Sequence, residues 1–340
     1  MAVSAAAPRL ERRARLDLRD YPAGAAWSAD GRSLVVAGGQ GALLWVDVAA
    51  ATVQRFGEHA GGALAVAWQG GGHQFVTSGQ DGEVRLWDAR SREARLVHAA
   101  AEWSEQLAFS SNGRLLAVST GRQLQVFDGG GALRVALPPH SGAIAALAWR
   151  ARTSELATVG NGGARVHRLE PAVQSRDHPW QGACLTASWS PDGRVLASGM
   201  QDGSVHFWNV AASSQSQMRG YGAKVALTSW SANSRYLATA ADQVIIVWNF
   251  SGRGPDGSEP LQMTAHTARV TQLAFQPQGP LLAAGARDRR LSLWRLAQPQ
   301  QPVDAHLLTD DVALLCWSGN GTQLAVADRS GELSLYALVS

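Results

Sequence analysis

Short apolar runs alternate with turn-forming residues along the whole chain. Residues 188–199 show the pattern most clearly: Ser-Trp-Ser, then the turn sequence Pro-Asp-Gly-Arg, then Val-Leu-Ala-Ser-Gly. Glycine supplies the positive φ angle that such turns need, and proline or aspartate fixes the bend. Short apolar runs bounded by these residues are typical of β-strands, and no segment shows a sustained helical period with helix caps. The pattern therefore predicts an all-β chain.

The same phrase occurs eight times at a nearly constant spacing. An aromatic residue on the first apolar run recurs in steps of 41, 41, 40, 40, 41, 45 and 42 residues. These aromatic positions are Trp27, Trp68, Phe109, Trp149, Trp189, Trp230, Phe275 and Trp317. A second position, on the third apolar run, keeps a similar step through Trp45, Trp87, Phe127, His167, Trp208, Trp248, Trp294 and Tyr336. Two landmarks with one period identify an internal repeat.

Each unit also has a more variable fourth stretch, such as residues 51–56 in the first unit. Four strands per roughly 40 residues, repeated, is the layout of a β-propeller blade. Eight units predict a ring of eight four-stranded blades. A seven-bladed ring with one displaced unit is the alternative.

The last unit has no room for a fourth strand, because its third run at 332–338 nearly ends the chain. Residues 15–19, Arg-Leu-Asp-Leu-Arg, alternate charged and apolar side chains as a half-buried strand does. We expect this segment to pair with the last unit and close the ring, which removes an open sheet edge. The predicted organisation is a basic leader at 1–14 and one propeller domain at 15–340.

From about residue 15 to its end, the chain resembles the WD40-repeat β-propeller family. In that family, hydrogen bonds link four side chains of a blade. They are a His on the loop into the blade, a Ser or Thr on the second strand, an Asp in the next turn and a Trp on the third strand. The matching residues are His59, Thr77, Asp81 and Trp87 in unit 2, Ser198, Asp202 and Trp208 in unit 5, and His266, Asp288 and Trp294 in unit 7.

Other units depart from this family pattern. In unit 5, His178 lies 11 residues before its landmark Trp189, whereas His59 lies 9 before Trp68. The hydroxyl position of unit 7 is Ala284. Unit 4 has His140, Asn161 and His167, and unit 6 has Tyr221, Asp242 and Trp248. We therefore do not expect a complete network in every blade.

Composition is consistent with a single soluble domain. No apolar run approaches the ~20 residues that span a bilayer, and the first residues do not have the pattern of a cleaved secretion signal. The two cysteines, Cys184 and Cys316, form neither a disulfide framework nor a metal-ligand spacing. These features predict a cytoplasmic protein with free thiols.

The formal net charge of +3 raises the possibility of nucleic-acid binding. A nucleic-acid interface needs a clustered basic face with interleaved aromatic residues. The densest clusters are Arg9, Arg12, Arg13, Arg15 and Arg19, and then Arg287, Arg289 and Arg290. A solvated basic leader is the favoured interpretation of the first cluster, so nucleic acid is not the expected partner.

The residues that the repeat does not explain are the candidates for function. Of 13 tryptophans, 11 occupy the two landmarks, and Trp103 and Trp180 lie instead near loops that lead into blades. Exposed tryptophan is enriched in interface hot spots, although each ring could simply cover the end of its own blade. The predicted partner-binding rim on this face consists of Trp103, Trp180, Gln80, Gln201, Tyr221, Lys224, Arg287 and Arg289. This mixture suits a peptide or protein partner.

No sequence motif supports catalysis. The chain has no nucleophile elbow and no phosphate-binding loop before a helix, and its histidines recur with the repeat. We therefore predict no catalytic residue, no cofactor and no metal, and a non-enzymatic platform for protein interactions, monomeric within a larger complex. The alternative is a small ligand or metal in the central channel, held by Glu102, Glu105, Asp310 and Asp311, or an enzyme that uses such a site.

One segment breaks the regular spacing. The step between units 6 and 7 is longer than the others because of the Gly-, Pro- and Ser-rich residues 251–260. Their composition indicates a loop. We expect a flexible excursion on the face opposite the loops that lead into blades, with a docking loop as the alternative.

Overall fold

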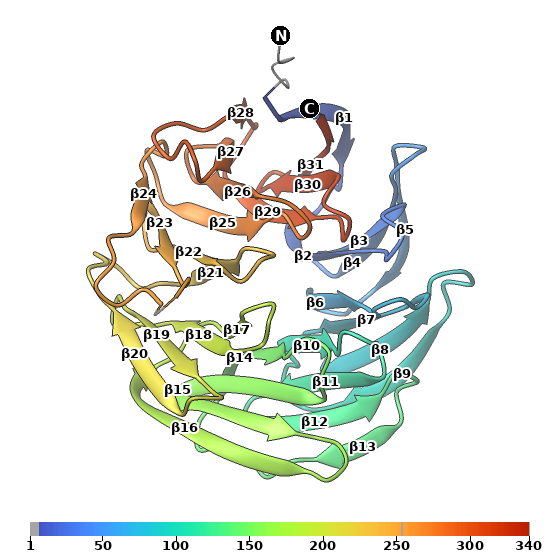
Figure 1. Ribbon diagram of the computed structural model, residues 1–340. Helices are drawn as coiled ribbons and strands as arrows, with labels where there is room; N and C mark the ends of the chain where they lie inside the picture. The colour runs from blue at the N-terminus through green and yellow to red at the C-terminus, as the bar shows by residue number, and fades with distance from the viewer. Residues whose placement is uncertain (1–6, 253, 340) are drawn as a thin grey trace.

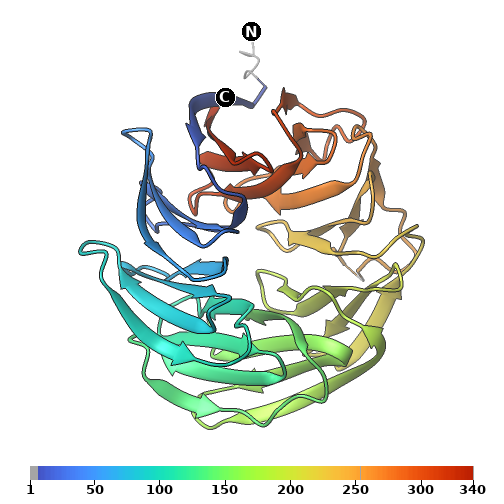
Figure 2. The same ribbon diagram turned by 180° about the vertical axis from the view of Figure 1, so that it is seen from behind.

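The chain folds into a closed ring of eight β-sheets around a central axis (Figure 1). The computed structural model describes residues 7–252 and 254–339, and within these residues every regular element is a strand. The eight-bladed arrangement is the one predicted from the repeat, so the seven-bladed alternative is not needed. Figure 2 shows the same ring from behind.

Blades 1 to 4 are formed by residues 22–183, in chain order. Their strands are β2 (Pro22–Trp27), β3 (Ser33–Gly38), β4 (Ala42–Asp47) and β5 (Thr52–Glu58); β6 (Ala63–Trp68), β7 (Gln74–Gly79), β8 (Glu83–Asp88) and β9 (Ala94–Ala99); β10 (Gln106–Phe109), β11 (Leu115–Thr120), β12 (Gln123–Asp128) and β13 (Leu133–Ala136); and β14 (Ile144–Trp149), β15 (Glu155–Arg168) and β16 (Gln174–Ala183).

Blades 5 to 8 complete the ring. Their strands are β17 (Ser188–Trp189), β18 (Val195–Gly199), β19 (Val205–Asn209) and β20 (Ser214–Met218); β21 (Leu227–Trp230), β22 (Tyr236–Ala240), β23 (Ile245–Asn249) and β24 (Leu261–Met263); β25 (Val270–Phe275), β26 (Leu281–Ala286), β27 (Arg290–Arg295) and β28 (Asp304–Leu307); and β29 (Val312–Trp317), β30 (Gln323–Asp328), β31 (Glu332–Val339) and β1 (Arg9–Asp17).

In blade 4, one long strand supplies both middle positions. The first half of β15 pairs with β14, and the second half pairs with β16. The two halves lie side by side, and the Thr158 hydroxyl in the first half donates to the Arg165 carbonyl in the second half at 3.3 Å. Gly162 and Gly163 lie between them with φ angles of 95° and 117°, which allows an abrupt turn.

The apolar core is divided among the junctions between blades. Eight clusters of buried residues are found in the described residues, and each combines side chains from two neighbouring blades. Leu156 of blade 4, for example, packs with Leu115 and Ala117 of blade 3. The alternation of apolar residues that predicts each strand therefore buries both faces of each sheet against the adjacent blades.

The first-strand tryptophans also link neighbouring blades by hydrogen bonds. In five cases the indole N–H donates to a first-strand carbonyl of the preceding blade, at 2.9 to 3.3 Å. The donor and acceptor pairs are Trp27 with Cys316, Trp149 with Ala108, Trp189 with Ala148, Trp230 with Ser188, and Trp317 with Ala274. Trp27 lies on β2 of blade 1 and Cys316 lies on β29 of blade 8, so the bond between them joins the first blade to the last.

The N-terminal strand closes the ring, as the sequence predicts. β1 pairs antiparallel with β31, so the blue and red ends of the ribbon lie side by side in Figures 1 and 2. Leu10 is 4% exposed and packs between blades 7 and 8, and its backbone N–H donates to the Asp304 carboxylate at 2.6 Å. Beyond the strand, the Leu18 N–H donates to the Gly331 carbonyl.

The predicted boundaries of this strand are wrong. The strand begins at Arg9 and ends at Asp17, so residues 9–14, assigned to a leader, lie in the sheet; residues 1–6 lie outside the described residues. The consecutive Arg12 and Arg13 interrupt the alternation in the sequence, and a β-bulge between Arg12 and Ala14 accommodates the extra residue.

The basic residues of this segment lie on the outer edge of blade 8. Arg13 pairs with Glu11 at 3.0 Å, Arg19 lies 3.8 Å from Asp17, and Arg15 pairs with Glu332. Charged side chains on an edge strand oppose pairing with another chain. The N-terminal arginine cluster is therefore explained as a protected sheet edge.

The long loop between β23 and β24 lies against blade 5. The Ser216 hydroxyl, on β20, donates to the Asp256 carboxylate at 3.0 Å. Within the loop, the Ser258 hydroxyl donates to the Pro255 carbonyl. These contacts hold the described part of this loop close to β20, the outer strand of blade 5.

Deletion of residues 1–20 is expected to lower the melting temperature sharply, because it exposes the edge of β31 and removes Leu10 from the blade 7–8 core. The single change Leu10→Ala should lower the free energy of unfolding by about 2–4 kcal/mol. The exposed Arg13→Ala variant is the control and should stay within about 0.5 kcal/mol of the parent. Thermal and urea denaturation measure both effects; an unchanged melting temperature in the truncated chain would show that closure does not stabilise the ring.

Candidate partner-binding face

The loops that lead into blades and the turns between second and third strands share one face, which we call the upper face. Backbone hydrogen bonds join each loop to the turn beside it: Gln80 N–H donates to the Gly62 carbonyl at 2.8 Å, and Arg287 N–H donates to the Arg269 carbonyl at 2.9 Å. The side chains expected to form the WD40 network and those expected to bind partners both belong to this face.

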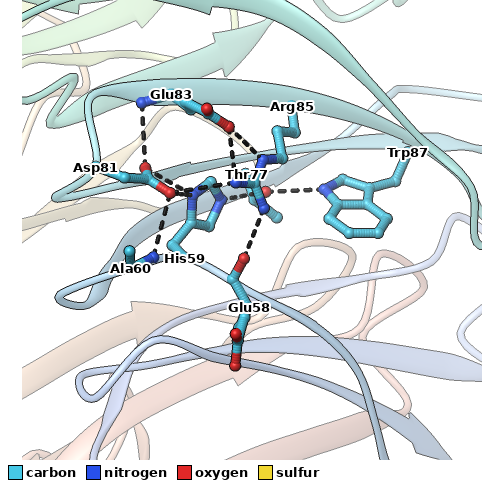
Figure 3. A network of polar contacts seen from close by, with 8 residues as sticks. All are labelled: Glu58, His59, Ala60, Thr77, Asp81, Glu83, Arg85 and Trp87. Carbon is cyan, nitrogen blue, oxygen red and sulfur yellow. Dashed lines mark hydrogen bonds and ion pairs between the residues drawn. The ribbon is translucent and has the colours of Figure 1, made fainter.

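In blade 2 the four network residues are joined in one chain of hydrogen bonds (Figure 3). The Trp87 indole N–H donates to the Thr77 hydroxyl at 2.8 Å, and that hydroxyl lies 2.8 Å from His59 Nε2. His59 Nδ1 lies 2.9 Å from the Asp81 carboxylate. Since Thr77 accepts from Trp87, its own proton goes to Nε2, so His59 is neutral and donates from Nδ1 to Asp81.

The network fastens the loop into blade 2 to the turn between β7 and β8. Asp81 also accepts from the backbone N–H groups of Ala60, in the loop, and Glu83, at the start of β8. Arg85 reaches the Glu58 backbone carbonyl at 2.6 Å and the Glu83 carboxylate at 2.7 Å (Figure 3). Burial lowers the pKa of His59 although Asp81 opposes that effect, which is consistent with a neutral ring.

Blade 7 forms the same network with a hydroxyl from a different strand. His266 Nδ1 lies 3.1 Å from Asp288, and its Nε2 lies 2.8 Å from the Ser292 hydroxyl, which also accepts from the Trp294 indole at 2.7 Å. Ser292 is on β27, directly opposite Ala284 of β26, the position where the family has its hydroxyl. Ser292 was not among the network residues predicted from the sequence; its position two residues before Trp294 was the available signal.

In blade 6 a tyrosine takes the place of the histidine. The Tyr221 hydroxyl lies 2.6 Å from the Thr239 hydroxyl and accepts from the Trp248 indole at 2.6 Å. Burial raises the pKa of Tyr221 to about 12, although the Thr239 and Trp248 hydrogen bonds oppose that effect. Tyr221 was predicted to belong to the partner-binding rim; its hydroxyl is hydrogen-bonded inside blade 6.

Blade 5 does not assemble the expected network. The Ser198 hydroxyl donates to the Gly199 carbonyl, Asp202 accepts from Ser204, and the buried Trp208 indole N–H has no partner among the described residues. Instead, the Trp180 ring stacks on His206 with centroids 3.8 Å apart, and His206 meets Trp208 edge-on at 4.4 Å. Trp180 is thus half-buried and covers the end of blade 5.

Blade 4 replaces the tryptophan with a second histidine. The Thr158 hydroxyl lies 3.4 Å from His140 Nε2 and 3.3 Å from His167 Nε2, and His167 Nδ1 lies 2.8 Å from the Ser175 hydroxyl. Burial, aided by repulsion from His140 and Arg165, lowers the pKa of His167 to about 4. His167 is therefore a buried neutral group in the folded chain.

Blade 3 retains only a hydroxyl pair. The buried Ser104 hydroxyl lies 2.8 Å from the Thr120 hydroxyl and anchors the loop between β9 and β10. The residues on either side, Glu102, Trp103 and Glu105, are exposed. Trp103 has an exposed fraction of 48%, among the highest of the large apolar side chains in the described residues.

The predicted rim therefore divides into two groups. Trp103 and the polar residues Gln80, Gln201, Lys224, Arg287 and Arg289 are exposed on the upper face. Trp180 and Tyr221 are half-buried and contribute to blade interiors. The exposed residues belong to different blades and are spread around the ring, so they form a rim and not a single cluster.

In the part of the chain that the structure describes, no group of three or more His, Cys, Asp or Glu side chains is arranged to hold a metal ion. The described residues also include no helix with the length and apolar character needed to cross a membrane.

Ser292→Ala is expected to lower the free energy of unfolding by about 1–3 kcal/mol, because it leaves the buried His266 and Trp294 without their shared hydroxyl. Adding Ala284→Thr to this variant should recover part of the loss, since the hydroxyl then comes from β26, as Thr77 does from β7. Urea denaturation measures both variants. A Ser292→Ala variant as stable as the parent would show that the network contributes nothing in blade 7.

Stability should fall as pH decreases through the range from 6.5 to about 4, because unfolded His167 takes up a proton there and the folded residue does not. The full loss from this residue is on the order of 3 kcal/mol below pH 4. His167→Phe should reduce the slope of this part of the pH profile; the slope that remains includes the contribution of His206, whose pKa burial also lowers to about 4. Urea unfolding midpoints, measured across this pH range, test the prediction. If stability changes with pH at the same slope in the parent and in His167→Phe, the prediction is wrong.

Comparison with known proteins agrees with this architecture. The family model described as "WD domain, G-beta repeat" matches residues 51–88, 173–209, 213–249 and 257–295. Each match ends one residue after a third-strand tryptophan: Trp87, Trp208, Trp248 or Trp294. The third strands that carry Trp45, Phe127, His167 and Tyr336 lie outside the matches.

Among curated proteins, the chain is 29% identical over 249 residues to the B-type cell cycle switch protein ccs52A of Medicago truncatula. It is 26% identical over 260 residues to Protein FIZZY-RELATED 3 of Arabidopsis thaliana. These alignments cover 68% and 70% of this chain but 50% and 52% of the relatives, so the chain spans about half their length. A shorter alignment, 28% identical over 170 residues, covers 47% of this chain and 34% of the WD repeat-containing protein slp1 of Schizosaccharomyces pombe.

Among solved structures, the computationally designed Ika8 protein superimposes with a TM-score of 0.81 over 96% of this chain and 99% of that one. The identity is 16%, so this likeness concerns the fold alone. The repeat period, the hydrogen-bond networks on the upper face and the matched family repeats agree with one another. Four of the eight repeats match the WD40 family model, so this chain carries WD40 repeats in a β-propeller fold.

Proposed function

We propose that the chain is a non-catalytic adaptor that binds protein or peptide partners on its upper face. The observation that carries this proposal is the contrast within that face. His59, His266, Tyr221 and most tryptophans are held inside the blades by hydrogen bonds, whereas Trp103 is left with 48% of its surface exposed. A large exposed aromatic ring on a rigid frame is the kind of residue that dominates binding energy in protein interfaces.

The polar residues around the ring support the same function. Gln80, Gln201, Lys224, Arg287 and Arg289 offer amide and cationic groups at four blades, which suits an extended contact with a protein surface. Their backbones are fixed by the loop-to-turn hydrogen bonds, so little conformational freedom is lost when a partner binds. The relatives named as cell cycle switch proteins agree with a regulatory adaptor built on this fold.

We also propose that the protein acts in the cytoplasm, as a monomeric propeller within a larger complex. Cys184 is buried without a disulfide, and burial raises the pKa of its thiol, so it is unreactive. A free thiol of this kind is compatible with a reducing compartment. Fractionation of the native cells, followed by size-exclusion chromatography of the soluble fraction, tests both statements.

Trp103→Ala is expected to reduce partner recovery about tenfold or more in affinity capture from native cells, without lowering the melting temperature. The matched control is Leu133→Ala, a similarly exposed apolar residue on the outer strand β13, which should retain every partner. Trp180→Ala should instead lower the melting temperature, because it removes the ring stacked on His206. Equal recovery of all partners by the parent and Trp103→Ala would contradict the proposed role of this face.

A further inference from the structure

The exposed Trp103 ring forms one wall of a cleft at the junction of blades 3 and 4. This Trp103 cleft has a volume of about 350 Å³ and is lined by Glu102, Trp103, Glu105, Ser119, Gly121 and Ile144, among others. That volume is near the lower end of the ~300–1,000 Å³ typical of ligand pockets, so the cleft suits one side chain and not a large molecule. The Ile144 N–H donates to the Gly121 carbonyl at 2.9 Å, which fixes the two blades on either side.

The walls of the cleft combine apolar surface with negative charge. Ile144 is 5% exposed and presents an aliphatic wall opposite the loop of blade 3. The Glu102 carboxylate lies over Gly121, where an added Cβ would collide with it. Neither Glu102 nor Glu105 has a basic side chain within ion-pair distance among the described residues, and the neighbouring Arg122 is not paired with them.

A second polar group in the cleft also lacks a partner. Ser119 is 2% exposed, lines the cleft, and its hydroxyl makes no hydrogen bond within residues 7–252 and 254–339. This oxygen is not among the fully enclosed polar atoms that lack a partner, so it reaches the cleft surface and is free to bond a ligand there. This observation is independent of the two carboxylates and lies in the same cavity.

We propose that the Trp103 cleft binds a lysine or arginine side chain from a peptide segment of a partner protein. The aliphatic stem lies against Ile144, the cationic head stands against the Trp103 ring and between Glu102 and Glu105, and Ser119 accepts or donates a hydrogen bond at the floor. This proposal rests on the proposed adaptor function and gives one contact of that function its chemistry.

The anchoring of the loop explains why these groups are available. Ser104 is fully buried and bonded to Thr120, so the loop is fixed at its centre while Trp103 and Glu105 on either side stay exposed. In blade 2, by comparison, the carboxylate of Asp81, in the turn between β7 and β8, is satisfied within the blade by His59 and Arg85. Blade 3 keeps the anchoring hydroxyl contact and leaves its charges for a ligand.

The test uses the full chain labelled with 5-fluorotryptophan, with the ¹⁹F resonance of Trp103 assigned from the Trp103→Phe variant. The probes are acetyl-Gly-Ser-X-Ser-Gly-amide peptides in which X is lysine, arginine, norleucine or glutamate. Lysine and arginine peptides should shift the Trp103 resonance saturably, with affinity at least about fivefold higher than the norleucine peptide, because only they carry the cation. Added salt should weaken them.

Variants separate the roles of charge and fold. Glu102→Gln/Glu105→Gln should weaken lysine-peptide binding at least about fivefold at an unchanged melting temperature. The control Glu93→Gln/Glu259→Gln makes the same change in net charge at two exposed residues outside the cleft and should leave binding unchanged. The proposal is overturned if norleucine binds as well as lysine, or if the Glu102/Glu105 variant binds like the parent.

The outcomes also distinguish this proposal from the proposed function. The peptide titration needs no natural partner, so a negative result there leaves partner capture through the upper face as an independent measurement. Conversely, if lysine peptides bind as described but Trp103→Ala still recovers every protein partner, the cleft holds cations and the adaptor function proposed for this face is wrong.

Discussion

Each blade of this propeller has two apolar faces, and only the neighbouring blades can cover them. The eight core clusters all lie between blades, so no blade has a core of its own. The stability of each unit therefore depends on its two neighbours, and a gap at any junction would expose apolar surface on both sides. The indole hydrogen bonds from one first strand to the preceding one strengthen five junctions; Trp68 donates within its own blade instead, and Phe109 and Phe275 have no N–H to donate.

The junctions without an indole bond use other contacts. Between blades 1 and 2, Phe56 packs edge-on against Trp87 and Phe75, with ring centroids 5.0 and 5.7 Å apart. Between blades 2 and 3, the Gln69 amide donates to the Gly113 carbonyl at 2.9 Å, and between blades 6 and 7 the Phe275 N–H donates to the Ser229 hydroxyl at 2.9 Å. Different side chains thus meet one geometric requirement, which is why the repeat tolerates so much variation.

The period and the turn residues were sufficient to predict the ring, because spacing and strand alternation are local properties of the sequence. The details that depend on contacts across strands were not predictable in this way. Ser292 replaces the hydroxyl missing at Ala284 because the two residues face each other on paired strands, 8 positions apart in the chain. Trp180 appeared to be a surplus aromatic residue, and only the fold shows that it stacks on His206. For Trp103 the sequence left open a rim contact or a cover for its own blade, and the fold leaves the ring 48% exposed. The carboxylates and Ser119 beside it become one site only when blades 3 and 4 are placed together.

The pairing of β1 with β31 has a consequence for how the chain is made. The two strands lie at opposite ends of the sequence, and Arg9 pairs with Val339, so this contact has one of the longest sequence separations in the molecule. Such a contact forms late, since the loop it closes contains nearly the whole chain. During synthesis β1 emerges first and its partner last, so it must wait unpaired while every other blade is produced. Its arginine-rich exposed positions keep the waiting strand soluble and discourage premature pairing with another nascent chain.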